Sequence, residues 1–135
     1  MARPRPKMPD ACYHAYCRVL EKAYRLTRKE RDIFRNLMYQ VADFSGVVIY
    51  EYTIMDNHFH IAVHVPEKKD ISEEELYRRV TVLYGLKKAE KIFKKWDYWR
   101  ETGQSDRVEK EQKMLLARMY DISQFMKTLL ERFTS

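Results

Sequence analysis

The pattern of apolar and polar positions predicts strands in three parts of the chain. Residues 11–20 are rich in aromatic and β-prone side chains, residues 47–55 are β-branched and aromatic, and residues 58–65 form another apolar-rich run. Asp56 and Asn57 separate the last two segments, and both residue types tolerate the left-handed backbone of a tight turn. The pattern therefore predicts one early strand and, later, a β-hairpin.

Apolar residues at helical spacing predict a first helix between the early strand and the hairpin. Thr27 and Glu30 have the spacing of a capping box, in which two side chains cap backbone N–H groups reciprocally. The Ser45-Gly46 pair ends the periodic run, as is common where glycine follows a helix. The buried face of this helix is expected to consist of Ile33, Phe34, Leu37, Met38, Val41 and Ala42.

A second helix is predicted after the hairpin. Ser72 with Glu75 forms another capping box, and the helix that it opens is expected to reach about Lys95. Residues 96–105 show no regular period and predict a loop. The inward positions of this helix are expected to be Leu76, Val80, Leu83 and Leu86.

The last part of the chain predicts a further helical region with one apolar stripe. Asp121 with Gln124 has the spacing of a local helix restart within it. The stripe consists of Leu115, Met119, Ile122, Met126, Leu129 and Phe133. The order strand, helix, strand, strand, helix, helix predicts an α+β fold with helices on one face of a largely antiparallel sheet.

Charge adds an indication of the partner. The chain has 26 Lys and Arg against 20 Asp and Glu, a net charge of +6. Such a balance favours a polyanionic partner, because neutralising phosphates releases condensed counterions. Solubility is an alternative explanation of the same charge, so the composition suggests nucleic acid without establishing it.

Two segments concentrate this charge. Residues 1–10 are expected to form an extended basic arm because three prolines forbid a helix there, with a frayed terminus as the alternative. The later turns of the second helix are rich in lysine, with a solvated face as the alternative. The candidate DNA-binding residues in these two segments are Arg3, Arg5, Lys7, Lys87, Lys88 and Lys91. Arg18 of the early strand is a further candidate, and all of them are expected to contact phosphates rather than base edges.

Length and cysteine content bound the organisation of the chain. Its 135 residues have the size of one domain, which we place at residues 11–135. Cys12 and Cys17 are an odd number of positions apart on one strand, so they face opposite sides and are expected to be free thiols. No signal peptide and no membrane span of roughly 20 apolar residues is visible. These features predict a soluble, cytoplasmic protein.

Histidines cluster on the third predicted strand. Because successive strand residues face opposite sides, His58, His60 and His64 share one face, and the residues between them form an apolar face. Histidines two positions apart hold their imidazoles roughly 6–7 Å apart and can converge on one divalent ion, although His-x-His also occurs by chance. His64 lies roughly 13 Å further along and is expected outside the first shell. His14 is expected either to be buried or to neighbour the site.

These residues resemble a known family. Ile54-Met-Asp-Asn-His-Phe-His-Ile-Ala-Val, with Tyr13-His14 and Arg18 on the first strand, is similar to the transposase domain of the IS200-like group, especially the REP-associated tyrosine transposases. The resemblance extends to residues 122–134 and is least specific over residues 84–120. It implies a ferredoxin-like sheet with helices on one face and an inserted helical segment around residues 84–120. The fourth strand of such a sheet is missing from the sequence.

The resemblance also implies the activity of an HUH endonuclease. His58 and His60 would bind Mg²⁺ or Mn²⁺, which would polarise a scissile phosphate in single-stranded or hairpin DNA. A tyrosine hydroxyl would then attack and form a 5′-phosphotyrosine. A non-catalytic nucleic-acid-binding or regulatory module of the same fold is the alternative, and an unrelated metal hydrolase is a third reading that lacks a carboxylate partner at a fixed spacing.

The position of the nucleophile separates this chain from the family pattern. In that pattern, the catalytic tyrosine and a polar metal ligand lie on a later helix, beyond the point where this sequence ends. We therefore expect the domain to lack its C-terminal part and to bind metal and DNA without cleaving, with Tyr120 as the substitute candidate for the nucleophile. Family members often act as homodimers, and Trp96, Tyr98 and Trp99 are expected either to form such a surface or to cap the core.

Overall fold

The computed structural model describes residues 10–19 and 25–134 and has the expected α+β architecture. Three strands, β1 (Ala11–Arg18), β2 (Val48–Ile54) and β3 (His58–Val65), form an antiparallel sheet in the order β1-β3-β2. Within the described residues, this is the order of a ferredoxin-like sheet without its fourth strand. The predicted basic arm lies outside the described residues, apart from Asp10.

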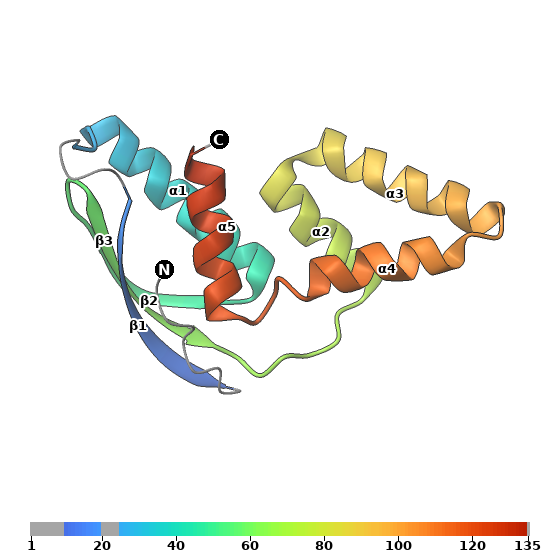
Figure 1. The fold of residues 1–135 in the computed structure, drawn as a ribbon, viewed down its shortest axis with the longest axis horizontal. Helices are drawn as coiled ribbons and strands as arrows, with labels where there is room; N and C mark the ends of the chain where they lie inside the picture. Colours follow the sequence, from blue (N-terminus) through green and yellow to red (C-terminus); the bar gives the residue numbers. More distant parts are fainter. Residues whose placement is uncertain (1–9, 20–24, 135) are drawn as a thin grey trace.

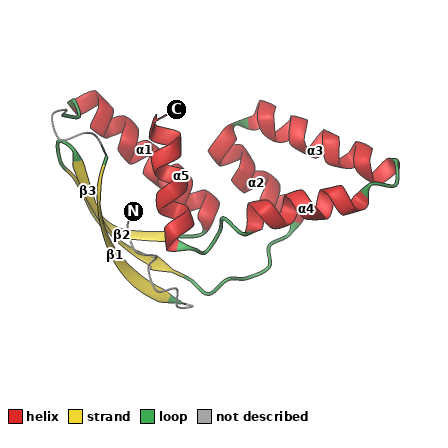
Figure 2. Ribbon diagram, viewed as in Figure 1, coloured by secondary structure: helices red, strands yellow, loops and turns green. Residues whose placement is uncertain are grey.

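Helices cover one face of this sheet and also extend beyond it. The helices are α1 (Arg28–Ser45), α2 (Glu73–Tyr84), α3 (Leu86–Glu101), α4 (Ser105–Leu116) and α5 (Ile122–Thr134). Figures 1 and 2 show α1 and α5 on one side of the sheet, whereas α3 and α4 run side by side as a helical hairpin that projects away from it. This hairpin occupies the segment for which an inserted helical region is expected.

Ring contacts hold α1 and α5 in place. The Phe34 ring of α1 lies 4.9 Å from the Phe59 ring of β3 and 5.1 Å from the Phe133 ring of α5. Phe34 and Phe59 are fully buried, as are Phe125 and Leu129 of α5. Burial of side chains of this size provides most of the favourable free energy of folding, so the helix-covered face of the sheet is the core of this half of the molecule.

The predicted boundaries of α1 are confirmed. The Thr27 hydroxyl accepts a hydrogen bond from the Glu30 N–H, and the Glu30 carboxylate accepts one from the Thr27 N–H, which completes the capping box. At the other end Gly46 has φ 78°, a left-handed conformation, and its N–H donates to the Ala42 carbonyl.

The hairpin is confirmed, but its expected left-handed backbone is wrong. The Met55 N–H donates to the His58 carbonyl at 2.8 Å, which closes the turn around Asp56 and Asn57. Asp10 and Tyr120 are the only non-glycine residues with positive φ in the described ranges, so neither turn residue is left-handed. The turn is held from outside instead, because its two carbonyls accept hydrogen bonds from the segment that leads from β1 to α1.

The predicted helix to about Lys95 and the predicted loop at residues 96–105 are wrong in their boundaries. The chain breaks at Gly85, whose φ of 93° and ψ of 157° are open to glycine and strained for other residues, and α3 then continues to Glu101. Trp96 explains the longer helix: it is fully buried, and its indole N–H donates to Glu111 of α4 at 2.9 Å. The aromatic residues of this segment therefore pack one helix of the hairpin against the other.

The local restart predicted before α5 is confirmed. The Asp121 carboxylate accepts a hydrogen bond from the Gln124 N–H at 3.0 Å, so it caps the new helix. Tyr120, just before it, has φ 54° and separates α4 from α5. The apolar stripe is thus shared between two helices and the turn between them.

Candidate metal and DNA site on the open face of the sheet

Strand β3 separates two chemically different faces. Phe59, Ile61, Val63 and Val65 are buried towards α1 and α5, whereas the histidines that alternate with them are half-buried. The alternation predicted from the sequence is therefore confirmed. We call the histidine side the open face, because none of the helices within residues 10–19 and 25–134 covers it (Figure 1).

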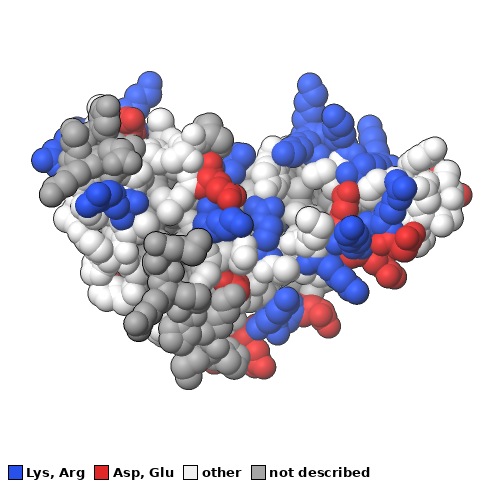
Figure 3. Space-filling model, viewed as in Figure 1, with Lys and Arg blue, Asp and Glu red and all other residues white. Residues whose placement is uncertain are grey.

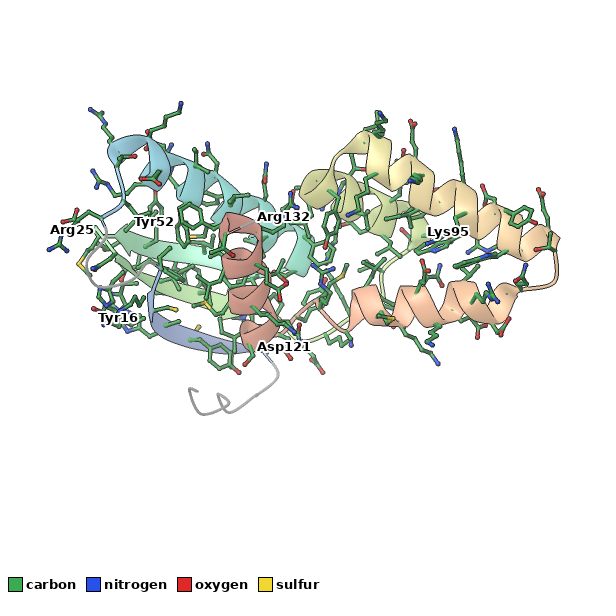
Figure 4. The ribbon with its side chains drawn as sticks, turned by 45° about the horizontal axis from the view of Figure 1, so that its top comes forward. Tyr16, Arg25, Tyr52, Lys95, Asp121 and Arg132 are labelled. Atoms are coloured by element: carbon green, nitrogen blue, oxygen red, sulfur yellow. The ribbon has the colours of Figure 1, made fainter. Side chains whose placement is uncertain are left out.

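Strand β1 contributes partners to this open face. His14, Tyr16 and Arg18 are exposed, and they pair in register with Ala62, His60 and His58. The Tyr16 ring stacks on His58 with centroids 5.1 Å apart and planes 14° apart, and the His14 ring lies 3.9 Å from that of His60. Figure 4 shows Tyr16 on the side of the sheet away from α1. The four rings form one cluster.

Asn57 orients the first histidine. Its side-chain oxygen lies 2.6 Å from His58 Nδ1. An amide oxygen only accepts hydrogen bonds, so Nδ1 carries the proton and Nε2 of the neutral ring keeps its lone pair. Asn57 is itself buried, and its carbonyl accepts a hydrogen bond from the Val19 N–H at 2.8 Å. The site therefore has a fixed group behind His58, of the kind that orients metal ligands.

Ion pairs join the same turn to α1 and to the segment before it. Asp56 lies 3.4 Å from Arg31 and 3.8 Å from Arg25, and its carbonyl accepts a hydrogen bond from the Leu26 N–H. Exposed pairs of this kind stabilise a fold only slightly, but here they act beside the backbone hydrogen bonds. The start of β3 is consequently fixed from two sides.

His64 has different neighbours. Its Nε2 lies 2.6 Å from a carboxylate oxygen of Asp10, and its ring stacks on Tyr50 with centroids 6.3 Å apart. The register shift between Ile49 and Glu51 is a bulge, which turns Glu51 to the histidine side that Tyr50 already faces. His64, at the far end of the row of histidines, is thus paired with the carboxylate of Asp10.

A small cavity lies between the two ends. It has a volume of about 120 Å³ and is lined by His14, Glu51, Tyr52, Thr53, His60, Ile61 and Ala62. Because Ala62 has only a methyl group, it leaves space between His14 and Glu51 on the flanking strands. The cavity places one carboxylate and two imidazoles around the same space.

The residues present fit a divalent ion in part. His58 Nε2 has no hydrogen-bond partner among the residues that the structure describes, and His60 lies two positions further on the same face. No group of three or more His, Cys, Asp or Glu side chains arranged to hold a metal occurs within residues 10–19 and 25–134. Water and phosphate oxygens are the ligands that Mg²⁺ and Mn²⁺ accept beside such side chains.

The predicted basic residues fall into separate places. Arg18 is exposed next to His58, whereas Lys87, Lys88 and Lys91 are exposed on α3, where Lys and Arg gather in Figure 3. Figure 1 shows that α3 belongs to the helical hairpin rather than to the sheet. Arg3, Arg5 and Lys7 lie outside the described residues.

Tyr120 lies among the helices and is not brought to the histidines. Its hydroxyl accepts a hydrogen bond from Arg79 of α2 at 2.9 Å, and its N–H donates to the Ser45 carbonyl at 2.7 Å. Its ring also lies so close to Gly46 that a Cβ there would overlap it. The residue joins α1, α2 and the start of α5.

The buried arginine beside Tyr120 has a defined electrostatic environment. Burial acts to lower the pKa of Arg79, but hydrogen bonds to Glu75 and Tyr120 outweigh it and raise the pKa. Hydrogen bonds from Arg78 and then Arg79 lower the pKa of Glu75 to about 2. These groups remain charged at neutral pH and cross-link α2 to the turn before α5.

Three further expectations concern side-chain environment. Cys12 and Cys17 are not joined in a disulfide, as predicted. Trp96 is buried and therefore caps the core of the helical hairpin, whereas Tyr98 is 60% exposed. Within the described ranges, no helix has the length and apolar character needed to cross a membrane.

Two site residues were missed at the level of the sequence. From the sequence, Asn57 is expected in the turn and in the family motif but not as a partner of His58, and Tyr16 is not singled out. The alternation of β1 signals that His14, Tyr16 and Arg18 share a face, but the pairing of β1 with β3 is needed to place that face beside the histidines.

Comparison with known proteins identifies the family. The family model described as "Transposase IS200 like" matches residues 7–106, which include the whole sheet and most of the helical hairpin. Searches of curated proteins and of solved structures gave no significant match. The matched part ends within α4, so α5 lies outside it. The chain belongs to the IS200-like transposase family.

Proposed function

We propose that this protein is a DNA-binding, metal-dependent transposase domain that acts on single-stranded or hairpin DNA at the open face of the sheet. The observation that carries the proposal is the orientation of His58 by Asn57, which leaves Nε2 free beside a second histidine. Family membership makes a transposition function and a DNA partner the expected context. The substrate form, the metal and the catalytic state are parts of the proposal.

His58 and His60 would hold a Mg²⁺ or Mn²⁺ ion, which supplies Lewis-acid stabilisation of charge on a phosphate when bound. Asn57 keeps the His58 ring in the required tautomer, and the buried residues between the histidines keep both rings on one side. Arg18, exposed beside His58, is positioned to contact a neighbouring phosphate. The lysines of α3 would bind a more distant part of the same DNA.

Metal binding tests the proposal directly. We expect His58→Ala and His60→Ala each to weaken Mn²⁺ binding at least about tenfold, measured by calorimetry or by the electron paramagnetic resonance of free Mn²⁺. His64→Ala is the matched control, since its ring lies on the same face but pairs with Asp10. Mn²⁺ binding of parental strength in the His58→Ala, His60→Ala double variant would refute the site.

The alternative is a non-catalytic nucleic-acid-binding module of the same fold. One observation favours it for this chain: the Tyr120 hydroxyl is engaged by Arg79 among the helices, away from the open face. Incubation with labelled hairpin DNA and Mn²⁺ separates the two functions, because a nicking enzyme forms a covalent protein–DNA adduct and a binding module does not. We expect no adduct through Tyr120, so an adduct that is lost in Tyr120→Phe would contradict this placement.

A further inference from the structure

The open face carries exposed aromatic rings that the proposed metal site does not use. Tyr16 is 58% exposed and Tyr50 is 64% exposed. Each lies against one of the histidines of β3, Tyr16 against His58 and Tyr50 against His64. Two aromatic side chains thus mark the two ends of the histidine row.

The geometry of Tyr16 leaves one face of its ring available. The ring is nearly parallel to that of His58, with centroids 5.1 Å apart, and it meets His60 edge-on at 6.0 Å. One ring face is therefore covered by an imidazole. The exposed 58% of the side chain then includes the opposite face, which is flat, apolar and fixed in orientation.

Tyr50 lies at a bulge in β2. Without the register shift between Ile49 and Glu51, alternation would place Tyr50 and Glu51 on opposite sides of the sheet. With the bulge, Glu51 turns to the histidine side that Tyr50 already faces, and the Tyr50 ring lies 6.3 Å from His64 with planes 20° apart. Bulges that re-aim a side chain are common beside functional sites.

We propose that Tyr16 and Tyr50 form a base-stacking platform, on which unpaired bases of single-stranded DNA stack next to the histidine site. The inference rests on the proposed function and names how that site holds its substrate. Exposed aromatic residues on a sheet are the usual means of binding unstacked bases, because every base has a π-face. A base on Tyr16 would bring the phosphate attached to its sugar towards His58 and Arg18.

Local charge favours bases over phosphates at the middle of this face. Glu51 lines the cavity between the two tyrosines, and Asp10 lies beside His64. Carboxylates repel a phosphate backbone that crosses them, whereas Arg18 attracts it at the edge beside His58. We therefore expect the sugar-phosphate backbone of the DNA to run along the Arg18 side of the sheet, with its bases stacked on the rings of Tyr16 and Tyr50.

Substitution at Tyr16 separates stacking from other roles. The probe is a single-stranded oligonucleotide that contains one 2-aminopurine, whose fluorescence is quenched when it stacks on an aromatic ring, in buffer with saturating Mn²⁺. We expect Tyr16→Leu to lower the affinity roughly 5- to 150-fold and to relieve the quenching, the range for loss of one stacked base. Tyr16→Phe keeps the ring and is expected to bind within about twofold of the parent.

Tyr50→Leu is also expected to lower the affinity for the oligonucleotide. The matched control is Tyr98→Leu, at a similarly exposed tyrosine on the helical hairpin, which is expected to bind like the parent. Circular dichroism of each variant shows whether the fold is kept. If Tyr16→Leu binds and quenches like the parent, the platform is wrong and the metal site stands. If the parent protein itself binds no single-stranded DNA, the proposed function fails, and the inference fails with it.

Discussion

The two faces of the sheet differ in how completely their side chains are satisfied. On the helix side, Phe59 is buried against Phe34, and the polar groups nearby are paired, as Arg79 is with Glu75 and Tyr120. On the open side, imidazoles and tyrosine rings contact one another but keep exposed surface. The side chains that stabilise the fold therefore lie on one side of β3, and those of the proposed binding site lie on the other.

Removal of a core ring gives the largest expected effect. Phe59→Ala is expected to lower the free energy of unfolding by about 3–5 kcal/mol, because it leaves a cavity against Phe34 and its neighbours. Tyr16→Ala, on the open face of the neighbouring strand, removes only a cross-strand pair and is expected to cost about 0.2–1 kcal/mol. Urea unfolding measures both variants, and equal losses would contradict the division between the faces.

Asn57 offers a smaller effect that concerns the site rather than the core. Asn57→Ala removes the acceptor beside His58 Nδ1 and is expected to weaken Mn²⁺ binding about 10- to 100-fold. Asn57→Asp keeps an acceptor at that place and is the matched control, expected to retain most of the affinity. Calorimetry with Mn²⁺ gives the comparison, and an Asn57→Ala variant of parental affinity would show that the hydrogen bond does not orient the ring.

The smallest effect at neutral pH concerns the ionic network on the helix side. Hydrogen bonds from Arg78 and Arg79 lower the pKa of Glu75 from its ordinary 4.5 to about 2. A carboxyl group with a lowered folded-state pKa stabilises the protein fully above its unfolded pKa. That stabilisation is lost as the pH falls from about 4.5 towards about 2.

Glu75→Gln is therefore expected to be less stable than the parent at pH 7 and to lose less stability between these two pH values. Thermal unfolding across this pH range measures the difference. Glu74→Gln, at the neighbouring exposed position, is the control and is expected to follow the parent curve. An unchanged slope in Glu75→Gln would show that the network with Arg78 and Arg79 does not contribute.

The errors in the predicted elements share one physical origin. The helix was expected to end near Lys95 because residues 96–105 lack an amphipathic period, yet Trp96 is buried against α4 and extends it. Likewise, the turn at Asp56 and Asn57 was expected to need left-handed backbone, but donors from the β1–α1 segment fix it instead. In both cases a partner distant in sequence overrides the local signal.

The sequence by itself determined the strands, the capped start of α1 and the separation of β3 into an apolar side and a histidine side, because residue period and side-chain chemistry are local properties. It also indicated the family through Met55-Asp-Asn-His-Phe-His60 and its neighbours. Only the tertiary structure decided what stands beside those histidines. The antiparallel pairing of β1 with β3 brings Tyr16 and His14 onto them, and the pairing of β2 with β3 brings Tyr50, since strand register depends on the whole sheet.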